Sequence, residues 1–197
     1  MATPEPLVIL IGLRASGKTS VGRAVAAWLG EGGVAGEKSG SGFVDLDDLT
    51  AASMSCRTPA AAIKSHGIEA FRAAEASSLA DVLRQPPAGV RVIALGGGTP
   101  TAPGAADLLR THAAGGRCLI VYLRASAAEL KRRLRQTDLA ARPSLTRGGA
   151  GVVEEVDALL TARDPLYRDI ARYVIEVDQL TIEQAADAVV KAMGRTH

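Results

Sequence analysis

Five short apolar segments recur along the chain, and they predict the strands of a sheet. They are LVILI (7–11), GFVDL (42–46), VRVIAL (90–95), CLIVYL (118–123) and YVIEV (173–177). The first, third and fourth are apolar without alternation, which is typical of strands buried on both faces.

Helical patterns fill the intervals between these segments. The first follows Lys18, and its apolar face comprises Val21, Val25, Trp28 and Leu29. Gly30 is expected to end this helix. Further helix starts are indicated by a Thr58–Pro59 cap and by capping boxes at Ser126 with Glu129 and Thr181 with Gln184. Strands that alternate with helices predict an α/β fold with a parallel sheet covered on both faces.

Length and composition fit one soluble domain over residues 1–197. The 23 basic and 21 acidic residues are dispersed, so we expect neither a nucleic-acid nor a membrane partner. The two cysteines are far apart, which argues against a disulfide framework or a zinc site. The first apolar segment is too short for a signal peptide or a membrane span. A cytoplasmic protein is predicted, and we expect a monomer.

Two segments interrupt the alternation of strands and helices. Residues 30–42 hold six glycines in 13 positions, which predicts a flexible surface insert. Residues 142–151, RPSLTRGGAG, form a second loop that we interpret as a functional lid.

The segment GLRASGKT matches G-x-x-x-x-G-K-[ST] through Gly12, Gly17, Lys18 and Thr19. Phosphate oxygens need several convergent donors, and a tight glycine turn at a helix start exposes enough backbone N–H groups. The lysine reaches the outer phosphates, and the threonine binds a magnesium ion. The motif follows a buried strand and precedes an amphipathic helix, so we expect a nucleoside triphosphate here rather than an empty turn.

Two acidic residues close the second strand. The chain contains no asparagine, which excludes the Asn-Lys-x-Asp guanine motif and favours ATP. Asp45 and Asp47 are two positions apart, so both are expected to project from the same side of the strand end. One carboxylate can then face magnesium and the other an acceptor hydroxyl. The alternative is a pair of solvated helix-capping acids, which is how we interpret Asp48.

Further candidates follow the third strand and lie in two helical patterns. Gly96, Gly97 and Gly98 would let the backbone approach a ligand closely. Arg72 and Glu75 have helical i, i+3 spacing, and an exposed ion pair is the alternative. The segment ARDPLYRDIA supplies Arg163 and Arg168, for which ordinary helix positions are again the alternative.

The chain resembles the shikimate kinase family in the order of six motifs. They are Walker A, D-x-D, F-R-x-x-E, G-G-G, R-P-x-L and R-x-P-L-Y-R. The resemblance covers roughly residues 7–190. It implies a P-loop fold related to the nucleoside monophosphate kinases, a three-layer α/β/α sandwich around a five-stranded parallel sheet. It also implies transfer of the ATP γ-phosphoryl group to the 3-hydroxyl of shikimate, in the biosynthesis of aromatic amino acids.

The resemblance implies a role for each matching residue. Catalysis would rest on Lys18, Asp47 and Arg142. ATP would be bound by Gly12, Ala15, Ser16, Gly17, Lys18, Thr19, Ser20, Arg135, which would stack on adenine, and Arg142. Shikimate would be bound by Asp47, Arg72, Gly96, Gly97, Gly98 and Arg163. Mg²⁺ would be bound by Thr19 and, through water, by Asp45.

The sequence departs from the family pattern in the lid, in the long glycine-rich insert and at Ile182, where a proline often lies beside adenine. Two other functions are considered. A gluconate kinase of the same fold would also use two acceptor-side arginines, although F-R-x-x-E with G-G-G favours shikimate. A regulator without catalysis is expected to lack Lys18 or Asp47, and both are present.

Overall fold

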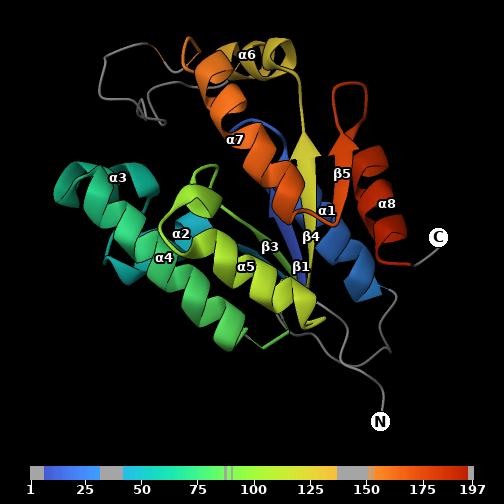
Figure 1. The fold of residues 1–197 in the computed structure, drawn as a ribbon, viewed down its shortest axis with the longest axis horizontal. Coiled ribbons are helices and arrows are strands. Elements are labelled where there is room, and N and C mark those ends of the chain that lie inside the picture. The colour runs from blue at the N-terminus through green and yellow to red at the C-terminus, as the bar shows by residue number, and fades with distance from the viewer. Residues whose placement is uncertain are drawn as a thin grey trace.

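The computed structural model describes residues 7–31, 42–86, 88–89, 91–136, 151 and 153–194, and its centre is a five-stranded sheet (Figure 1). The strands are β1 Leu7–Ile11, β2 Phe43–Asp45, β3 Val92–Ala94, β4 Cys118–Arg124 and β5 Tyr173–Glu176. They lie in the order β2-β3-β1-β4-β5, and every neighbouring pair is parallel. The predicted parallel sheet is confirmed.

Helices cover both faces of this sheet. They are α1 Lys18–Glu31, α2 Leu46–Ser53, α3 Pro59–His66, α4 Ile68–Arg84, α5 Ala105–Ala114, α6 Ala127–Arg135, α7 Val156–Ile170 and α8 Ile182–Ala192, with a 3-10 turn, η1, at Thr99–Thr101. Helices α1 and α8 pack together on one face, while α4, α5 and α7 lie on the other (Figure 1). The three-layer sandwich is therefore confirmed. Helices α2 and α3 pack against α4 beside the sheet.

Burial follows the apolar pattern of the sequence. All residues of β1 and β3 are buried, as are most of β4, because these strands have neighbours on both sides and helices on both faces. The outermost strand β5 is largely exposed, and Tyr173 retains 41% of its accessible surface. The continuously apolar segments thus mark the central strands, as predicted.

Some helix ends differ from the predictions. The Thr58 cap and the reciprocal Thr181–Gln184 box are present. At α6 only half of the predicted box forms: the Ser126 hydroxyl accepts from the Glu129 N–H, but the Glu129 carboxylate pairs with arginines instead. Gly30 does not end α1, which continues to Glu31.

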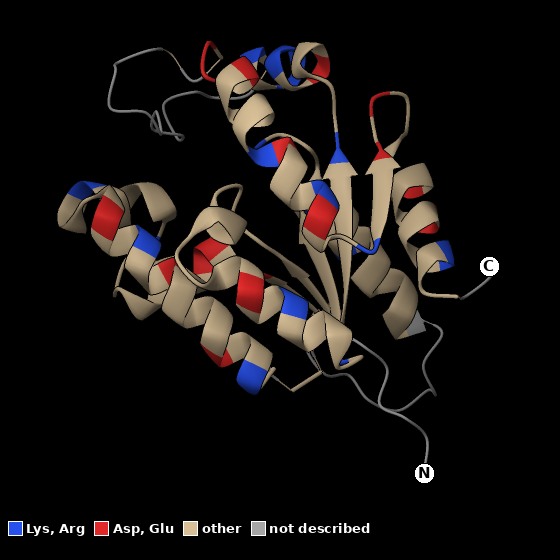
Figure 2. Cartoon of the chain, viewed as in Figure 1, with Lys and Arg blue, Asp and Glu red and all other residues tan. Residues whose placement is uncertain are grey.

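Charged residues of both signs are mixed over the helices (Figure 2). The strands carry charge only at their carboxyl ends, where Asp45 ends β2, Arg124 ends β4 and Glu176 ends β5. Within the described residues, no helix is both long and apolar enough to cross a bilayer.

Candidate active site

A cavity of about 760 Å³ opens at the carboxyl ends of the strands. Its walls come from the loop after β1, the start of α2, helices α3 and α4, the glycine turn after β3, helix α7 and the segment from Val177 to Ala185. Ligands of open α/β sheets bind at this edge, and the volume suits small molecules.

The loop between β1 and α1 forms one end of the cavity, which residues 13–21 line. Ala15 and Gly17 have positive φ angles of 63° and 94°, a backbone shape that can turn successive N–H groups toward one point. The Ser16 hydroxyl is buried and has no hydrogen-bond partner among the described residues. Helix α1 begins at Lys18, so its free N–H groups also face this end. The arrangement favours a phosphate group.

Two residues of the glycine-lysine motif have different tasks. Gly12 does not line the cavity; a Cβ atom there would lie 2.5 Å from the Leu123 carbonyl oxygen, so glycine allows the loop to pass β4 closely. The Lys18 ammonium group is buried and donates to the Leu13 carbonyl oxygen at 2.9 Å. Its side chain is thus folded back over the phosphate-binding turn.

The acidic residues are arranged differently from the prediction. Helix α2 begins at Leu46, directly after β2, so Asp47 lies in the first helical turn and not on a strand. Asp45 rather than Asp48 caps this helix, since its carboxylate accepts the Asp47 N–H at 3.2 Å. The other Asp45 oxygen accepts from the Thr19 hydroxyl at 2.7 Å. All three acids nevertheless line the cavity.

Asp47 lies in an unfavourable place for a charge. Burial, together with the nearby carboxylates of Glu75 and Asp45, raises its pKa from 3.8 to about 7, although Lys18 opposes this shift. Its Oδ1 atom is buried and has no hydrogen-bond partner among the described residues. Asp47 can therefore exchange a proton near neutral pH and offers an open acceptor to a ligand hydroxyl.

The first glycine after β3 makes room for these oxygen atoms. A Cβ atom on Gly96 would collide with Asp47 Oδ1 and would lie 2.5 Å from Glu75 Oε1 and 2.8 Å from Thr99 Oγ1. The Thr99 hydroxyl donates to Glu75 Oε1 at 2.7 Å. Gly96 does not itself line the cavity, whereas Gly97 and Gly98 do.

Arg72 and Glu75 form more than an exposed ion pair. Glu75 is fully buried, and its carboxylate binds the Arg72 guanidinium at 2.5 Å. A Cβ atom on Gly98 would overlap the Arg72 guanidinium group. The buried carboxylate and the missing side chain therefore fix Arg72 against the cavity wall.

Arg163 of α7 forms a second cationic group in the cavity. Its Nη1 donates to the Gly97 carbonyl oxygen at 2.6 Å, and the same oxygen accepts from the Tyr167 hydroxyl at 2.5 Å. Tyr167 is fully buried, and burial raises its pKa to about 12, so its hydroxyl remains a donor. Arg168 points elsewhere and pairs with Asp164. The structure thus brings two of the predicted guanidinium groups to one end of the cavity.

A sequence model of the shikimate kinase family matches residues 14–194, which is most of the chain. The chain belongs to the shikimate kinase family. It is 36% identical over 181 residues to shikimate kinase 2 of Yersinia pestis, an alignment that covers 90% of this chain and 91% of the relative. Shikimate kinase 2 of Sodalis glossinidius is 35% identical and covers 87% of each chain.

Solved structures agree with this assignment. The shikimate kinase of Acinetobacter baumannii, determined in complex with shikimate, superposes with a TM-score of 0.76 and 27% identity over 96% of this chain and 93% of the other. The shikimate kinase family transfers a phosphoryl group from ATP to shikimate, and the cavity has a phosphate-binding turn and a cationic end. Family membership therefore favours shikimate over the alternative gluconate acceptor.

Most of the residues that the family resemblance predicted for the site line the cavity. Its lining includes Ala15, Ser16, Gly17, Lys18, Thr19, Ser20, Asp45, Asp47, Arg72, Gly97, Gly98 and Arg163. Gly12 and Gly96 do not line the cavity. Arg142 and the lid up to residue 150 lie outside the described residues, as do residues 32–41 of the glycine-rich insert.

Arg135 is the residue that was predicted to stack on adenine. This residue is exposed and does not line the cavity, whereas Arg133 does. The Arg133 guanidinium donates to the Val177 carbonyl oxygen at 2.9 Å, and Glu129 holds its Nε at 2.6 Å. Hydrogen bonds from Arg132 and then Arg133 lower the pKa of Glu129 to about 2, so this anchor stays charged. Arg133, and not Arg135, is therefore the arginine of α6 at the cavity wall.

Sequence reasoning also missed Glu75 and Tyr167 as parts of the site. Glu75 was recognised only as a helical partner of Arg72, and its complete burial is the property that matters. Tyr167 lies one helical turn after Arg163, which is the spacing that could have shown that both reach Gly97.

Replacing Gly98 by alanine is expected to raise the KM for shikimate by about tenfold, near 1.4 kcal/mol of lost binding. The added methyl group displaces the Arg72 guanidinium, while the Gly98 φ of −117° is open to alanine, so the fold should persist. Steady-state kinetics at saturating ATP will measure the effect. Gly30→Ala is the control, because its methyl group meets nothing within 4 Å. A normal KM in the Gly98 variant would contradict the predicted binding of shikimate by Arg72.

Proposed function

We propose that this chain transfers the γ-phosphoryl group of ATP to the 3-hydroxyl of shikimate, and that Asp47 accepts the proton of this hydroxyl. The observation that carries the proposal is the buried Asp47 Oδ1 without a partner among the described residues, in a cavity that also holds a phosphate-binding turn. A pKa of about 7 suits a group that exchanges protons at neutral pH. Membership of the shikimate kinase family supports the acceptor.

The nucleotide is assigned to the end of the cavity formed by residues 13–21. Backbone N–H groups and the Ser16 hydroxyl would bind phosphate oxygens, and Lys18 would leave the Leu13 carbonyl to neutralise the charge that develops during transfer. Arg133 would lie against the adenine, opposite the segment that contains Ile182. Arg142, the first residue of the proposed lid, would close over the phosphates.

Mg²⁺ is the expected cofactor, and the residues present fit it. Thr19 and Asp45 offer a hydroxyl and a carboxylate oxygen 2.7 Å apart at the phosphate end, and oxygen ligands are those that Mg²⁺ prefers. Thr19 would bind the ion directly and Asp45 through water. The bound ion would neutralise charge on the phosphates during transfer.

Shikimate is assigned to the opposite end of the cavity. Arg72 and Arg163 would bind its carboxylate, because a guanidinium presents parallel N–H donors to a planar anion. The Gly97–Gly98 backbone would approach the ring hydroxyls. Buried anchors hold both arginines before any ligand arrives, which reduces the entropy lost on binding.

The assignment is tested by coupled measurement of ADP release with shikimate, with gluconate and with no acceptor. Shikimate should give rapid release and the other two little. Equal release with gluconate would favour the gluconate kinase alternative, and ATP binding without turnover on either acceptor would favour a regulatory protein.

Arg163→Lys is expected to raise the KM for shikimate about tenfold or more, the value of one charge-assisted hydrogen bond. Lysine keeps the positive charge but cannot donate both to Gly97 and to a carboxylate through a planar fork. The KM for ATP should remain near that of the wild type. Initial rates over a range of both substrates will separate the two effects.

A shikimate analogue with a primary alcohol in place of the carboxylate provides the control for Arg163. It should be a poor substrate for the wild type, and the lysine substitution should impair it much less. Equal losses on the acid and the alcohol would show that Arg163 does not bind the carboxylate.

We also propose that the protein is cytoplasmic, where ATP is supplied, and that it acts as a monomer. The phosphate-binding turn, Asp47 and both arginines line a cavity of a single chain, so the proposed chemistry needs no second subunit. Nucleic acids and membranes are not expected as partners, given the mixed surface charge (Figure 2).

A further inference from the structure

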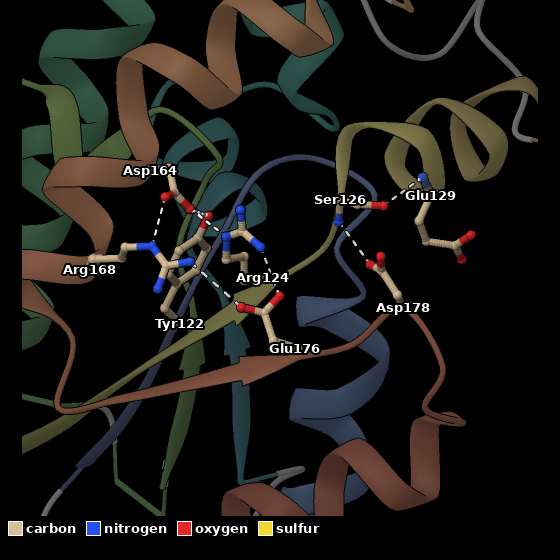
Figure 3. A network of polar contacts seen from close by, with 8 residues as sticks. All are labelled: Tyr122, Arg124, Ser126, Glu129, Asp164, Arg168, Glu176 and Asp178. Carbon is tan, nitrogen blue, oxygen red and sulfur yellow. Dashed lines mark hydrogen bonds and ion pairs between the residues drawn. The ribbon is translucent and has the colours of Figure 1, made fainter.

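A network of polar side chains lies at the carboxyl ends of β4 and β5, beside helix α7, which also carries Arg163 (Figure 3). Its centre is Asp164, the next residue of α7. One carboxylate oxygen accepts from the Tyr122 hydroxyl at 2.9 Å and from Arg124 Nε at 2.7 Å. The other oxygen accepts from Arg168 Nε at 2.7 Å. A single carboxylate thus joins α7 to β4 and to the next turn of its own helix.

Glu176 at the end of β5 completes the network. It accepts from Arg124 Nη1 at 2.9 Å, and its other oxygen lies 3.6 Å from Arg168 Nη2 (Figure 3). Two carboxylates and two guanidinium groups therefore alternate between α7 and the two strands. Networks of this kind hold their members in place better than isolated exposed pairs do.

Helix α7 needs such support at this point. Pro165 lies inside the helix, and proline has no N–H to donate to the carbonyl of Thr161. The missing hydrogen bond weakens the turn from Thr161 to Pro165, and this turn contains Arg163, which donates to the Gly97 carbonyl oxygen. The Asp164–Arg168 contact spans the residues on both sides of Pro165. It therefore ties Asp164, which lies within the weakened turn, to the next turn of the helix.

Tyr122 connects the network to Tyr167, which like Arg163 donates to the Gly97 carbonyl oxygen. Its ring packs edge-on against Tyr167, with centroids 5.3 Å apart and an interplanar angle of 85°. Tyr122 is almost fully buried while its hydroxyl binds Asp164. The same tyrosine thus supports Asp164 and Tyr167, and Tyr167 shares the Gly97 oxygen with Arg163.

Asp164 stays ionised in this setting. Burial disfavours its charged form, but hydrogen bonds from Arg168, Arg124 and Tyr122 outweigh this effect, and the pKa of Asp164 is lowered. The carboxylate is mostly shielded from solvent, with 19% of its side chain exposed, so these contacts are screened less than surface pairs.

We propose that Asp164 is a positioning residue for shikimate binding: it fixes α7 through Tyr122, Arg124 and Arg168 so that the Arg163 guanidinium is held ready for the carboxylate. This inference rests on the proposed function of the cavity. It distinguishes Asp164, which touches no cavity wall, from the residues that bind substrate. Loss of Asp164 should reduce the affinity for shikimate and leave the nucleotide end unchanged.

The experiment compares Asp164→Ala and Asp164→Asn with a control on the same helix. Asp169→Ala is the control, since Asp169 pairs with Arg110 of α5 at 2.6 Å but has no contact with the network. The KM for shikimate should rise about tenfold in Asp164→Ala and about threefold in Asp164→Asn, which can still accept hydrogen bonds. The KM for ATP should change less than about twofold in all three variants. If Asp164→Ala does not fold, the isosteric asparagine variant decides.

A second arm asks whether Asp164 acts through Arg163. In an Arg163→Lys background, Asp164→Asn should raise the KM for shikimate no further, because the group that it positions is already lost. Independent, multiplying effects would overturn the proposal, as would an unchanged KM in both Asp164 variants. Equal increases in the KM values for ATP and shikimate would indicate an effect on the whole cavity and not on Arg163 alone, and would also overturn it. Absence of shikimate turnover in the wild type would instead refute the proposed function.

Discussion

Asp47→Asn is expected to lower kcat by about two orders of magnitude and to raise the stability of the folded protein at pH 8. Asparagine has almost the same shape but cannot accept the proton of the shikimate hydroxyl. The substitution also removes a negative charge that lies close to Glu75 and Asp45. The Asp47 carboxylate therefore serves the reaction but lowers the stability of the folded protein at pH 8.

The pH dependence of this stability effect follows from the Asp47 pKa, which is 3.8 ordinarily and about 7 in the folded protein. The folded state binds the proton more tightly than the unfolded state. Between about pH 4 and pH 7 the unfolded chain has already lost this proton, so the unfolding free energy falls as the pH rises. Above pH 7 the wild type carries the whole penalty, whereas the asparagine variant never does.

Thermal unfolding at pH 5 and pH 8, with turnover measured on the same samples, checks this prediction. The variant should exceed the wild type by about 2–4 °C or more at pH 8, equivalent to at least about 1 kcal/mol, and by less at pH 5. Asp81→Asn is the control, since Asp81 is exposed on α4, does not line the cavity and pairs with Arg84 at 3.0 Å. An identical stability gain at both pH values, or turnover near that of the wild type, would contradict the assigned role.

Lys18→Met is expected to reduce kcat/KM by a factor of about 10² or more while the protein stays folded, because an electrostatic contact of this kind contributes several kcal/mol to the transition state. Methionine can fill the space of the buried lysine side chain, but it has no positive charge to neutralise the negative charge that develops on the phosphoryl group. The hydrogen bond to the Leu13 carbonyl is lost, so a modest decrease in Tm should accompany the effect.

Lys191→Met provides the comparison for Lys18. Lys191 is exposed on α8 and pairs with Asp187, so its loss should leave kinetics and Tm nearly unchanged. Circular dichroism will establish that the Lys18 variant is folded before its kinetics are interpreted. Near-normal turnover of a folded Lys18→Met protein would remove the nucleotide from this turn.

Features that depend on neighbouring residues could be predicted from the sequence. The apolar segments gave the five strands to within a few residues, because a strand buried on both faces needs continuous apolar side chains. The Thr58 and Thr181 caps were predictable for the same reason, since their hydrogen bonds reach only three residues along the chain. Ser126 was only half predictable, because Glu129 binds arginines, Arg133 among them, and not the helix start.

The functional site likewise has local features that the sequence predicts and others that it does not. A phosphate-binding turn is a local arrangement of backbone N–H groups, so its eight-residue motif determines it. Asp47 was identified correctly as a cavity residue although its predicted strand position was wrong, because α2 begins earlier than the alternation suggested. Arg133 and Arg135 could not be separated, since they flank the buried Leu134 on opposite sides and the helix pattern treats them alike.

The sequence by itself determined the α/β class, the nucleotide-binding turn and the set of residues that carry phosphoryl-transfer chemistry, because each is encoded within a few neighbouring positions. The tertiary structure alone decided the strand order, which arginine of α6 lines the cavity, the burial of Glu75 and the contacts of Asp164 with β4 and β5. These features join residues distant in sequence, and their energies depend on how the packed elements exclude water and bring charges together. A local pattern carries no information about either.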